Sequence, residues 1–282
     1  MRDLAPFLKC RNDGRPRLMG IVNVTPDSFH ANSRVSSIED AVQRAILMWE
    51  DGADWVDIGG ESTRPGSKPV DVNEEMERVV PVIKALREAK PFGLISVDTR
   101  RVEVASAALE AGADMINDVS GLRNKEMFDL VIHSVSPVCI MHMQGEPGNM
   151  QNNPHYEDVV SEVSQNLLGT ADRLIREGHP PELIILDPGI GFGKNLKQNL
   201  ELLSNSSNLG SLGRFPILWG VSRKSLFDDL LNREKSENRL SGTLGVAAYA
   251  YRKGIDILRV HDVAEHNDLL KVITQLEALE NE

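Results

Sequence analysis

Residues 50–54 of this chain are Glu50-Asp-Gly-Ala-Asp54, and this short pattern indicates the fold class because it recurs twice. The later copies are Glu110-Ala-Gly-Ala-Asp114 and Arg252-Lys-Gly-Ile-Asp256. In each copy a glycine follows a helical pattern and an acidic residue precedes a short apolar run, which is typical of a turn from a helix into a buried strand. We therefore expect the carboxylates of these turns to be structural and to lie where the strands begin.

Short apolar runs alternate with helical patterns along the whole chain. Strands are expected at 17–24, 54–59, 94–98, 114–118, 137–142, 183–187, 216–221 and 255–260. Helices are expected near 38–51, 73–89, 101–112, 125–134, 156–177, 195–205, 239–253 and 264–279. Repeated strand–helix units predict a parallel sheet, and a chain of 282 residues suits one (β/α)8 TIM barrel of roughly 250 residues. We predict an N-terminal leader over residues 1–16 and one α/β barrel domain over residues 17–282.

Polar residues end the apolar runs, although a buried strand needs only a turn at that point. They are Asn23, Asp57, Asp98, Asn117, His142, Asp187, Ser222 and His261. The carboxyl ends of all strands in a TIM barrel meet at one face, so these side chains are expected to share one site. A doubly wound open sheet is the structural alternative, but it would place its ligand near one switch point. The first strand also lacks the G-x-G-x-x-G pattern of that fold.

Composition restricts the partners of this protein. The 31 basic and 42 acidic side chains give a net charge of −11, which disfavours binding to nucleic acid or to an anionic membrane. A small anionic substrate is still compatible with this charge if basic residues gather locally. The N-terminus lacks the apolar core of a signal peptide, so we expect a cytoplasmic protein. The two cysteines, Cys10 and Cys139, provide no disulfide framework.

Segments after the expected strands suit a planar heterocycle and an anion. In Asp187-Pro-Gly-Ile-Gly-Phe-Gly193 the glycines allow close backbone approach, the carboxylate offers two acceptor oxygens and the phenylalanine offers a flat wall. Positive charge follows the last two strands, in Ser222-Arg-Lys-Ser225 and Arg259-Val-His261, where barrel phosphate sites often lie. Asp98 and Asn117 end adjacent strands, and for each of them a helix-capping role is about as expected as a role in the site.

Taken together, these segments resemble dihydropteroate synthases, which are pterin-binding TIM barrels. The matching segments are Asn23-Val-Thr-Pro-Asp-Ser-Phe29, Asp57-Ile-Gly-Gly-Glu-Ser-Thr-Arg-Pro-Gly66, Ser96-Val-Asp-Thr99, Ile116-Asn-Asp-Val-Ser-Gly121, Met141-His-Met143, Asp187-Pro-Gly-Ile-Gly-Phe-Gly-Lys194, Ser222-Arg-Lys-Ser225 and Arg259-Val-His-Asp-Val263. They follow the order of the family from about residue 17 to the C-terminus. The resemblance implies condensation of 6-hydroxymethyl-7,8-dihydropterin diphosphate with 4-aminobenzoate, which gives 7,8-dihydropteroate and diphosphate in folate biosynthesis.

The resemblance also implies a pterin pocket. Asp187 would bind the N3–H and 2-amino edge of the pterin, Asn117 its other polar edge, and Lys224 the O4/N5 side. Asp98 would stabilise positive charge in the ring as the carbon–oxygen bond to diphosphate breaks, which is a contribution directed at the transition state. The apolar walls implied for this pocket are Phe192 and Met141.

The family pattern implies further contacts for the diphosphate and the second substrate. Arg259 and His261 would hold the diphosphate together with Mg²⁺, and Asn23 would contact the metal, because an amide oxygen suits a hard cation that keeps most of its waters. The catalytic residues would be Asp98, Lys224, Arg259 and His261. The aminobenzoate site and its closing loop would include Thr63, Arg64, Pro65 and Ser225. A homodimer is implied as well.

This sequence departs from the usual family pattern in two loops and one helix start. His30-Ala-Asn-Ser33 replaces the common Ser-Asp-Gly-Gly, so the first loop loses paired glycines and is expected to close with different dynamics. Gln144 stands where a basic residue is frequent, which weakens a positive contact there. The segment Leu226-Phe-Asp-Asp229 lacks a common glycine. None of these changes removes a residue assigned to chemistry.

Other functions fit the sequence less well. A pterin-dependent methyltransferase shares the barrel, but it needs neither an aminobenzoate pocket nor a diphosphate site. A metal-dependent hydrolase would need several convergent ligands, and His142 with His261 does not make such a set. An aldolase could form a Schiff base on Lys224, which borohydride trapping would reveal. A non-catalytic pterin-binding paralogue would be expected to have lost residues such as Asp98 or Lys224.

Overall fold

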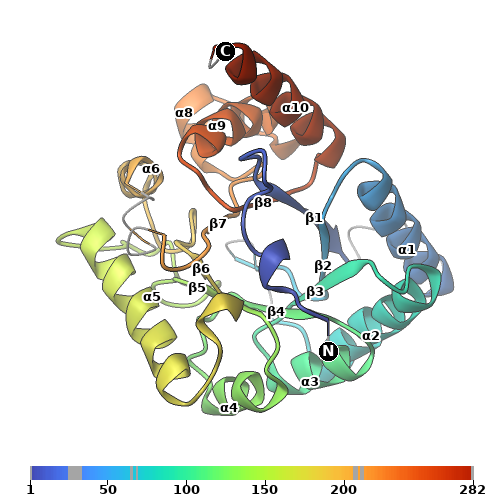
Figure 1. Cartoon of the computed structure of the whole chain (residues 1–282). Coiled ribbons are helices and arrows are strands. Elements are labelled where there is room, and N and C mark those ends of the chain that lie inside the picture. The colour runs from blue at the N-terminus through green and yellow to red at the C-terminus, as the bar shows by residue number, and fades with distance from the viewer. Residues whose placement is uncertain are drawn as a thin grey trace.

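The computed structural model describes residues 2–24, 34–63, 66–67, 69–205, 209 and 213–280. Eight parallel strands form one sheet in the order β6-β5-β4-β3-β2-β1-β8-β7. The strands are β1 Arg17–Asn23, β2 Trp55–Gly59, β3 Leu94–Asp98, β4 Met115–Asp118, β5 Val138–Met141, β6 Ile184–Asp187, β7 Leu218–Trp219 and β8 Ile257–Val260. A parallel bridge between Leu186 and Ile217 joins the two edges of the sheet. The predicted single TIM barrel is confirmed, with helices surrounding the strands (Figure 1).

Each predicted helix is present, at bounds that differ by a few residues. The α-helices are α1 Arg34–Glu50, α2 Val72–Ala89, α3 Val102–Glu110, α4 Lys125–Ser134, α5 Val159–Arg176, α6 Leu196–Ser204, α8 Leu226–Leu231, α9 Leu240–Arg252 and α10 Val263–Glu280. Short 3₁₀ turns lie at Ala5–Phe7, Pro181–Leu183 and Ser236–Arg239. Helix α5 begins later than predicted because Asp158 caps it by accepting the Ser161 N–H. Throughout the described ranges, no helix combines the length and apolarity needed to cross a membrane.

Strand β7 is shorter than the predicted 216–221 because its flanking residues cannot extend the ladder. Pro216 has no N–H to donate, although its carbonyl accepts a hydrogen bond from the Leu186 N–H at 2.9 Å. Gly220 already lines the cavity described below. Helix α8 is absent from the helical ranges predicted above, although Leu226–Asp229 was noted as a helix start in the family pattern, and its six residues follow directly on the Ser222–Ser225 segment.

Alternation along the strands separates two apolar layers. Outward-facing residues such as Val56, Val97 and Leu258 belong to the large core between the sheet and the helices. Inward-facing residues form a second cluster to which every strand contributes one side chain. They are Met19, Trp55, Leu94, Met115, Cys139, Ile185, Leu218 and Ile257. Cys139 is thus a small residue of the buried core.

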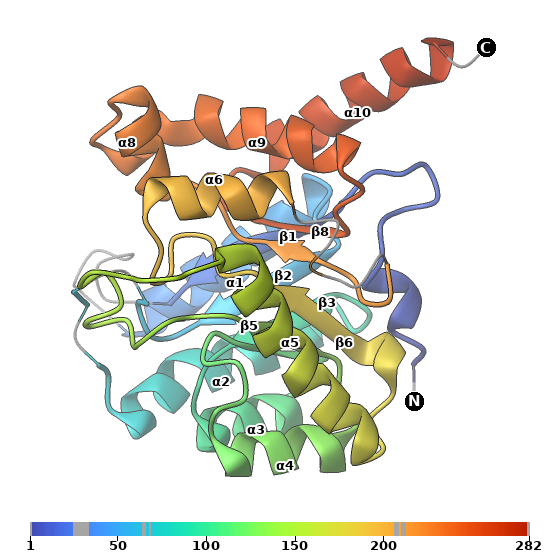
Figure 2. The ribbon, with the colours of Figure 1, turned by 90° about the vertical axis from the view of Figure 1, so that its left-hand side faces the viewer.

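The N-terminal leader closes the barrel at the end where the strands begin. Leu8 is fully buried in the inward-facing cluster, and Leu4 and Phe7 pack against it. The Trp55 indole N–H donates to the Phe7 carbonyl at 3.0 Å. Figure 1 shows this dark blue segment crossing the barrel, and Figure 2 places it opposite the loop between β5 and α5. Within the described residues, the leader therefore covers the interior at this end, and the cavity described below lies at the opposite end, where the strands finish.

The repeated acidic turns are structural, as predicted. Asp54 accepts the Leu18 N–H, Asp114 accepts the Ile95 N–H and Asp256 accepts the Ile217 N–H. Each carboxylate therefore satisfies a backbone donor at the start of a neighbouring strand. Asp54 also pairs with Arg11 at 2.8 Å and Arg17 at 2.9 Å, and Asp114 pairs with Arg87 at 2.7 Å. These turns fix the strand register at the closed end of the barrel, away from the site.

Replacing Asp54 by alanine should lower the free energy of unfolding by about 2–3 kcal/mol, because the partly buried donors of Arg11, Arg17 and Leu18 lose their shared acceptor. Urea denaturation measures the change. Asp13→Ala is the matched control, since the Asp13–Arg15 pair lies at the surface and should contribute less than about 1 kcal/mol. Equal losses in the two variants would contradict a structural role specific to Asp54.

Candidate active site

Most of the inward-facing positions become polar one step above the apolar layer. Side chains two residues apart on a strand point to the same face, so the next inward residues follow directly from the cluster below. They are Ile21, Asp57, Ser96, Asn117, Met141, Asp187, Gly220 and Arg259. The change from apolar to charged within one repeat places buried carboxylates, an amide and a guanidinium together in the middle of the barrel.

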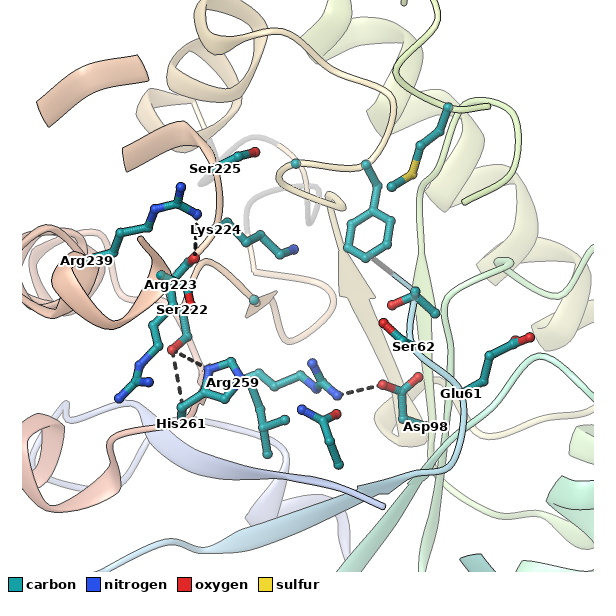
Figure 3. A pocket seen from close by; sticks show the side chains of 18 residues that line it. Glu61, Ser62, Asp98, Ser222, Arg223, Lys224, Ser225, Arg239, Arg259 and His261 are labelled. Carbon is teal, nitrogen blue, oxygen red and sulfur yellow. Dashed lines mark hydrogen bonds and ion pairs between the residues drawn. The ribbon is translucent and has the colours of Figure 1, made fainter. Parts of the chain in front are cut away.

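A cavity of about 460 Å³ opens above this polar layer. It is lined by Ile21, Asn23, Glu61, Ser62, Thr63, Asp98, Met150, Gly191, Phe192, Gly220, Ser222, Arg223, Lys224, Ser225, Ser236, Arg239, Arg259 and His261. Figure 3 shows Arg259 pointing toward Asp98, with Lys224 reaching into the same space above it in this view. Residues on or after seven of the strands thus face one space, as a barrel active site requires.

Arg259 is held between two carboxylates at the floor of the cavity. Its Nε donates to Asp57 Oδ2 at 2.6 Å, and its Nη2 donates to Asp98 Oδ2 at 2.6 Å. The Asn117 amide donates to the same Asp57 oxygen at 3.0 Å. This network joins β2, β3, β4 and β8, and its charge-assisted bonds fix the direction of each side chain. Asp57 was not among the predicted binding residues, although its position at a strand end did mark it.

Burial and charge set the protonation of this pair. Burial raises the pKa of Asp98 to about 7, against the lowering effect of Arg259, and Asp57 adds a further increase. Burial by itself would lower the pKa of Arg259, but the carboxylates of Asp57 and Asp98 raise it above its ordinary value. The arginine therefore stays charged, while Asp98 titrates near neutral pH.

Asp187 and Lys224 form the other half of the floor. Burial raises the pKa of Asp187, and the nearby ammonium of Lys224 opposes that shift. Burial also lowers the pKa of Lys224 to about 8, against the effect of Asp187. The Lys224 ammonium lies 4.3 Å from the centroid of the Phe192 ring, which places a cation over an aromatic face. Carboxylate, ammonium and ring thus surround the space that a flat polar heterocycle would fill.

The glycines after β6 allow this loop to approach the end of β5 closely. Gly189 has a φ of +67°, and a Cβ there would lie only 1.8 Å from the His142 carbonyl oxygen. Its N–H donates to Asp187 Oδ1 at 2.7 Å. A side chain at this position would therefore displace the loop that carries Phe192.

The anion side of the cavity is formed by the segments after β7 and β8. The Ser222 hydroxyl lies 2.9 Å from His261 Nδ1 and accepts the His261 N–H at 3.2 Å, which fixes the imidazole. Arg223 has a φ of +56°, and its guanidinium pairs with Asp262. Arg239, at the end of a 3₁₀ turn before α9, donates to the Arg223 carbonyl at 3.2 Å. Positive charge is concentrated here despite the net charge of the chain.

Most of the predicted site residues face this cavity or its floor. Asn23, Thr63, Asp98, Phe192, Lys224, Ser225, Arg259 and His261 line it. Asn117 contacts the floor through Asp57, and Asp187 lies beside Lys224 and near Gly220. Met141 packs in one cluster with Phe192 and Met150, which line the cavity. The predictions for Arg64, Pro65 and residues 30–33 lie outside the described residues.

Two features of the site could not have been assigned from the sequence. Arg239 lies far along the chain from the end of β7 and carries no motif of its own. Glu61 was quoted only within a motif, yet it accepts from Arg100 at 3.0 Å, Arg101 at 3.0 Å and the Val70 N–H at 3.0 Å. Burial opposes the effect of Arg100, but the net result lowers the pKa of Glu61. This ionised group anchors the segment after β2 beside the cavity.

Comparison with known proteins identifies the family. The model of the pterin binding enzyme family matches residues 19–261. The dihydropteroate synthase of Escherichia coli strain K12 is 44% identical over 268 residues, which cover 94% of each chain. This chain belongs to the dihydropteroate synthase family. The resemblance inferred from the sequence motifs is therefore confirmed.

Solved dihydropteroate synthases share the whole fold. The enzyme of Xanthomonas albilineans with 4-aminobenzoic acid has a TM-score of 0.85 and 44% identity, and covers 94% of both chains. The same enzyme in complex with 7,8-dihydropteroate has a TM-score of 0.85 and 41% identity, with 95% of this chain and 96% of that chain covered. The barrel of these enzymes is thus present over nearly the whole of this chain.

Proposed function

We propose that this protein condenses 6-hydroxymethyl-7,8-dihydropterin diphosphate with 4-aminobenzoate, as the family assignment implies. The observation that carries the proposal is the polar floor of a single cavity, where Asp187 and Lys224 lie on one side and Asp98 and Arg259 on the other. Such a floor suits a pterin, and the basic groups beside it suit a diphosphate. Formation of 7,8-dihydropteroate from the two substrates is the direct test.

The pterin is bound by complementary hydrogen-bonding edges. We assign Asp187 to the N3–H and 2-amino donors, and Lys224 to the O4/N5 acceptors. Asn117 is assigned to the other polar edge of the ring, and its bond to Asp57 holds the amide in place. Phe192 provides an apolar face, backed by Met141 and Met150. A buried donor or acceptor is costly when unpaired, so this arrangement selects a heterocycle with matching edges.

Bond cleavage precedes bond formation in the proposed mechanism. The carbon–oxygen bond to diphosphate breaks, its electron pair leaves with the diphosphate, and a methylene cation conjugated with the pterin remains. Asp98 then faces positive charge that was absent from the ground state. The arylamine lone pair forms the carbon–nitrogen bond, and the nitrogen subsequently loses a proton to water or diphosphate. Asp98 and Arg259 are bonded to each other, so charge at both ends of the breaking bond is met by fixed groups.

The leaving diphosphate is assigned to Arg259 and His261. The guanidinium has five N–H donors, so its bonds to two carboxylates leave donors for phosphate oxygens. His261 is oriented by Ser222 toward the same space (Figure 3). Both side chains line the cavity, which brings them within one binding site.

A divalent cation fits beside these groups. Asn23 lines the cavity and offers one amide oxygen, while no cluster of three or more His, Cys, Asp or Glu side chains suited to a metal exists in the described ranges. A single protein ligand is expected when Mg²⁺ is held mainly by substrate phosphates and water. We propose that Asn23 would hold Mg²⁺, which would neutralise charge on the departing diphosphate.

The second substrate is assigned to the outer part of the cavity. Ser225 lies at its rim near Arg239, and Thr63 comes from the segment after β2 (Figure 3). Arg64 and Pro65 are proposed to complete this site. A carboxylate would bind the Ser225 hydroxyl and adjacent backbone, with the amine directed inward toward the pterin. Sulfonamides, which carry a similar arylamine, are expected to compete for the same space.

The order of binding gives a specific prediction. Aminobenzoate should bind at least about tenfold more tightly once a pterin, Mg²⁺ and diphosphate occupy the floor, because these ligands organise the loops that complete its site. Calorimetry with and without the first ligands measures the difference. Tight binding to the free protein, unchanged by the other ligands, would show that the second site is preformed.

A methyl-transferring relative remains the second candidate, and the anion side of the cavity argues against it. Ser222, Lys224, Arg259 and His261 gather where a diphosphate would leave, whereas methyl transfer needs no such group. Release of diphosphate that depends on aminobenzoate distinguishes the two reactions. Location in the cytoplasm and assembly as a homodimer remain predictions, which fractionation and light scattering would check.

A further inference from the structure

The loop after β6 contains a buried cation to which the catalytic assignment gives no role. Lys194 is 3% exposed, and its Nζ donates to the carbonyls of Phe192 at 2.9 Å, Gly189 at 3.1 Å and His142 at 3.3 Å. It also lies 3.1 Å from His142 Nδ1. These contacts satisfy a lysine ammonium with oxygen and imidazole acceptors, and within the described parts of the chain none of its hydrogen bonds goes to a carboxylate.

The contacts of Lys194 join two elements that form the pterin floor. The His142 carbonyl lies directly after β5, whereas those of Gly189 and Phe192 belong to the loop after β6. Gly189 contacts the Asp187 carboxylate, and the Phe192 ring lies against Lys224. A change at Lys194 would therefore be transmitted to both the pterin-binding carboxylate and the aromatic wall.

The same amine acts on Asp187 through its charge when it is protonated. Burial lowers the pKa of Lys194 to about 7, against the effect of Asp187, so the positive charge is complete at acid pH and is lost above neutral pH. Burial raises the pKa of Asp187, and the cations that oppose this are Lys224 after β7, Lys194 itself and Arg259 on β8. Cys139, from β5, is a neutral thiol whose own pKa is raised well above its ordinary value, chiefly by burial. Burial, and then Lys194, lowers the pKa of His142 to about 3, so this imidazole is neutral and can accept at Nδ1.

We propose that Lys194 is a positioning residue for the pterin substrate, which clamps the Gly189–Phe192 loop to β5 and keeps positive charge behind the Asp187 carboxylate. The inference rests on the proposed function, because it assigns Asp187 to the donor edge of a pterin. Burying an ammonium that has no hydrogen-bonded carboxylate is costly, so a purely structural clamp would be made more easily by neutral donors. The positive charge of Lys194 has a function if it stabilises the ionised carboxylate of Asp187.

Two substitutions separate the donors of Lys194 from its charge. Lys194→Met removes both, whereas Lys194→Gln keeps two N–H donors without charge. Tyr156→Phe is the matched control, because the Tyr156 hydroxyl donates to the Gly193 carbonyl of the same loop at 3.0 Å without supplying a positive charge. The probe is 6-hydroxymethylpterin, titrated by calorimetry across acid and neutral pH with each folded variant.

Lys194→Met should weaken binding of this pterin by about tenfold or more at neutral pH. Pterin affinity should fall as the pH is lowered, because Asp187 becomes protonated; we call this fall the acid limb of the affinity profile. In both lysine variants the acid limb should move to higher pH, because loss of a nearby cation raises the pKa of Asp187. The glutamine variant should bind the pterin more tightly than the methionine variant, but its acid limb should remain at higher pH than in the wild-type protein. The control should keep the wild-type acid limb and lose little affinity.

The outcomes separate the two hypotheses. Wild-type protein that does not bind the pterin at any pH would overturn the proposed function itself. Pterin binding by wild type together with an unmoved acid limb in Lys194→Gln would overturn the inference and leave the function intact. If the methionine variant does not fold, the glutamine variant still decides between these results.

Discussion

Replacing Asp98 by asparagine should slow diphosphate release by about 10²–10³-fold and change pterin affinity much less. The substitution keeps the size of the side chain and one carbonyl acceptor for the Arg259 Nη2 donor, which lies at 2.6 Å. It removes the negative charge that faces the cation formed when the carbon–oxygen bond breaks. A preorganised charge acts on the transition state more than on the neutral ring of the substrate.

The same variant should also lose a pH dependence. Burial raises the pKa of Asp98 to about 7, so the wild-type carboxyl is neutral below that pH and ionised above it. The wild-type chemical rate should therefore rise as pH increases through about 7, because only the ionised form stabilises the cation. The Asp98→Asn rate should lack this rise, since the amide does not titrate in that range.

Single-turnover diphosphate release measures this step, with pterin affinity determined separately, because slow product release could hide a chemical defect. Asp118→Asn is the matched control. Asp118 is a buried carboxylate on the next strand that accepts the Ser120 and Leu122 N–H groups, and it does not line the cavity. A wild-type rate in Asp98→Asn would show that Asp98 only holds Arg259, as a structural or passive binding residue would.

The barrel and its polar face could be predicted because both follow from short-range rules. Each turn such as Glu50–Asp54 joins a helix to a strand, and repeated strand–helix units of this kind form a parallel sheet. The two-residue alternation of side chains along each strand then determines which residues face inward. Trp55 and Asp57 share a face, as do Ile185 and Asp187, so an apolar layer followed by polar residues is already present in the sequence.

Pairing within the polar layer could not be predicted in the same way. Arg259 contacts both Asp57 and Asp98 although these carboxylates lie at different heights on their strands. That geometry depends on strand tilt and on the length of the arginine side chain, which no local pattern specifies. The sequence indicated the groups present in the site, whereas the network that restrains them required the three-dimensional structure.

Residues that support the site from outside the strand ends were also missed. Lys194 was quoted at the end of a motif, but its role depends on the His142 carbonyl of a different element. Arg239 reaches the cavity from a 3₁₀ turn that binds the Arg223 carbonyl. Met150, which was not assigned to the pocket wall, lines the cavity and packs in one cluster with Met141 and Phe192. Such contacts are set by loop packing and leave little local signal in the sequence.

Removing the Asp187 carboxylate should nearly abolish pterin binding. Asp187→Ala deletes a buried charged acceptor for the donor edge of the ring, and the expected loss is about 2–4 kcal/mol, or roughly 30-fold to 1000-fold in affinity. Calorimetry with 6-hydroxymethylpterin gives the value. The alanine variant also removes the acceptor of the Gly189 N–H, which lies at 2.7 Å from Oδ1, so some of its loss will come from loop displacement.

Asp187→Asn separates these two effects, because the two carboxylate oxygens of Asp187 have different surroundings. Oδ1 accepts the Gly189 N–H, while Oδ2 lies near the cavity, 3.8 Å from where a Cβ of Gly220 would be. An asparagine whose oxygen stays with Gly189 would present an NH₂ group to the pterin donors, which leaves donors facing each other in a dry pocket. The loop should then remain in place while pterin affinity falls nearly as far as in Asp187→Ala. Wild-type affinity in a folded Asp187→Asn protein would mean that Asp187 orients the loop and that the pterin donor edge binds elsewhere.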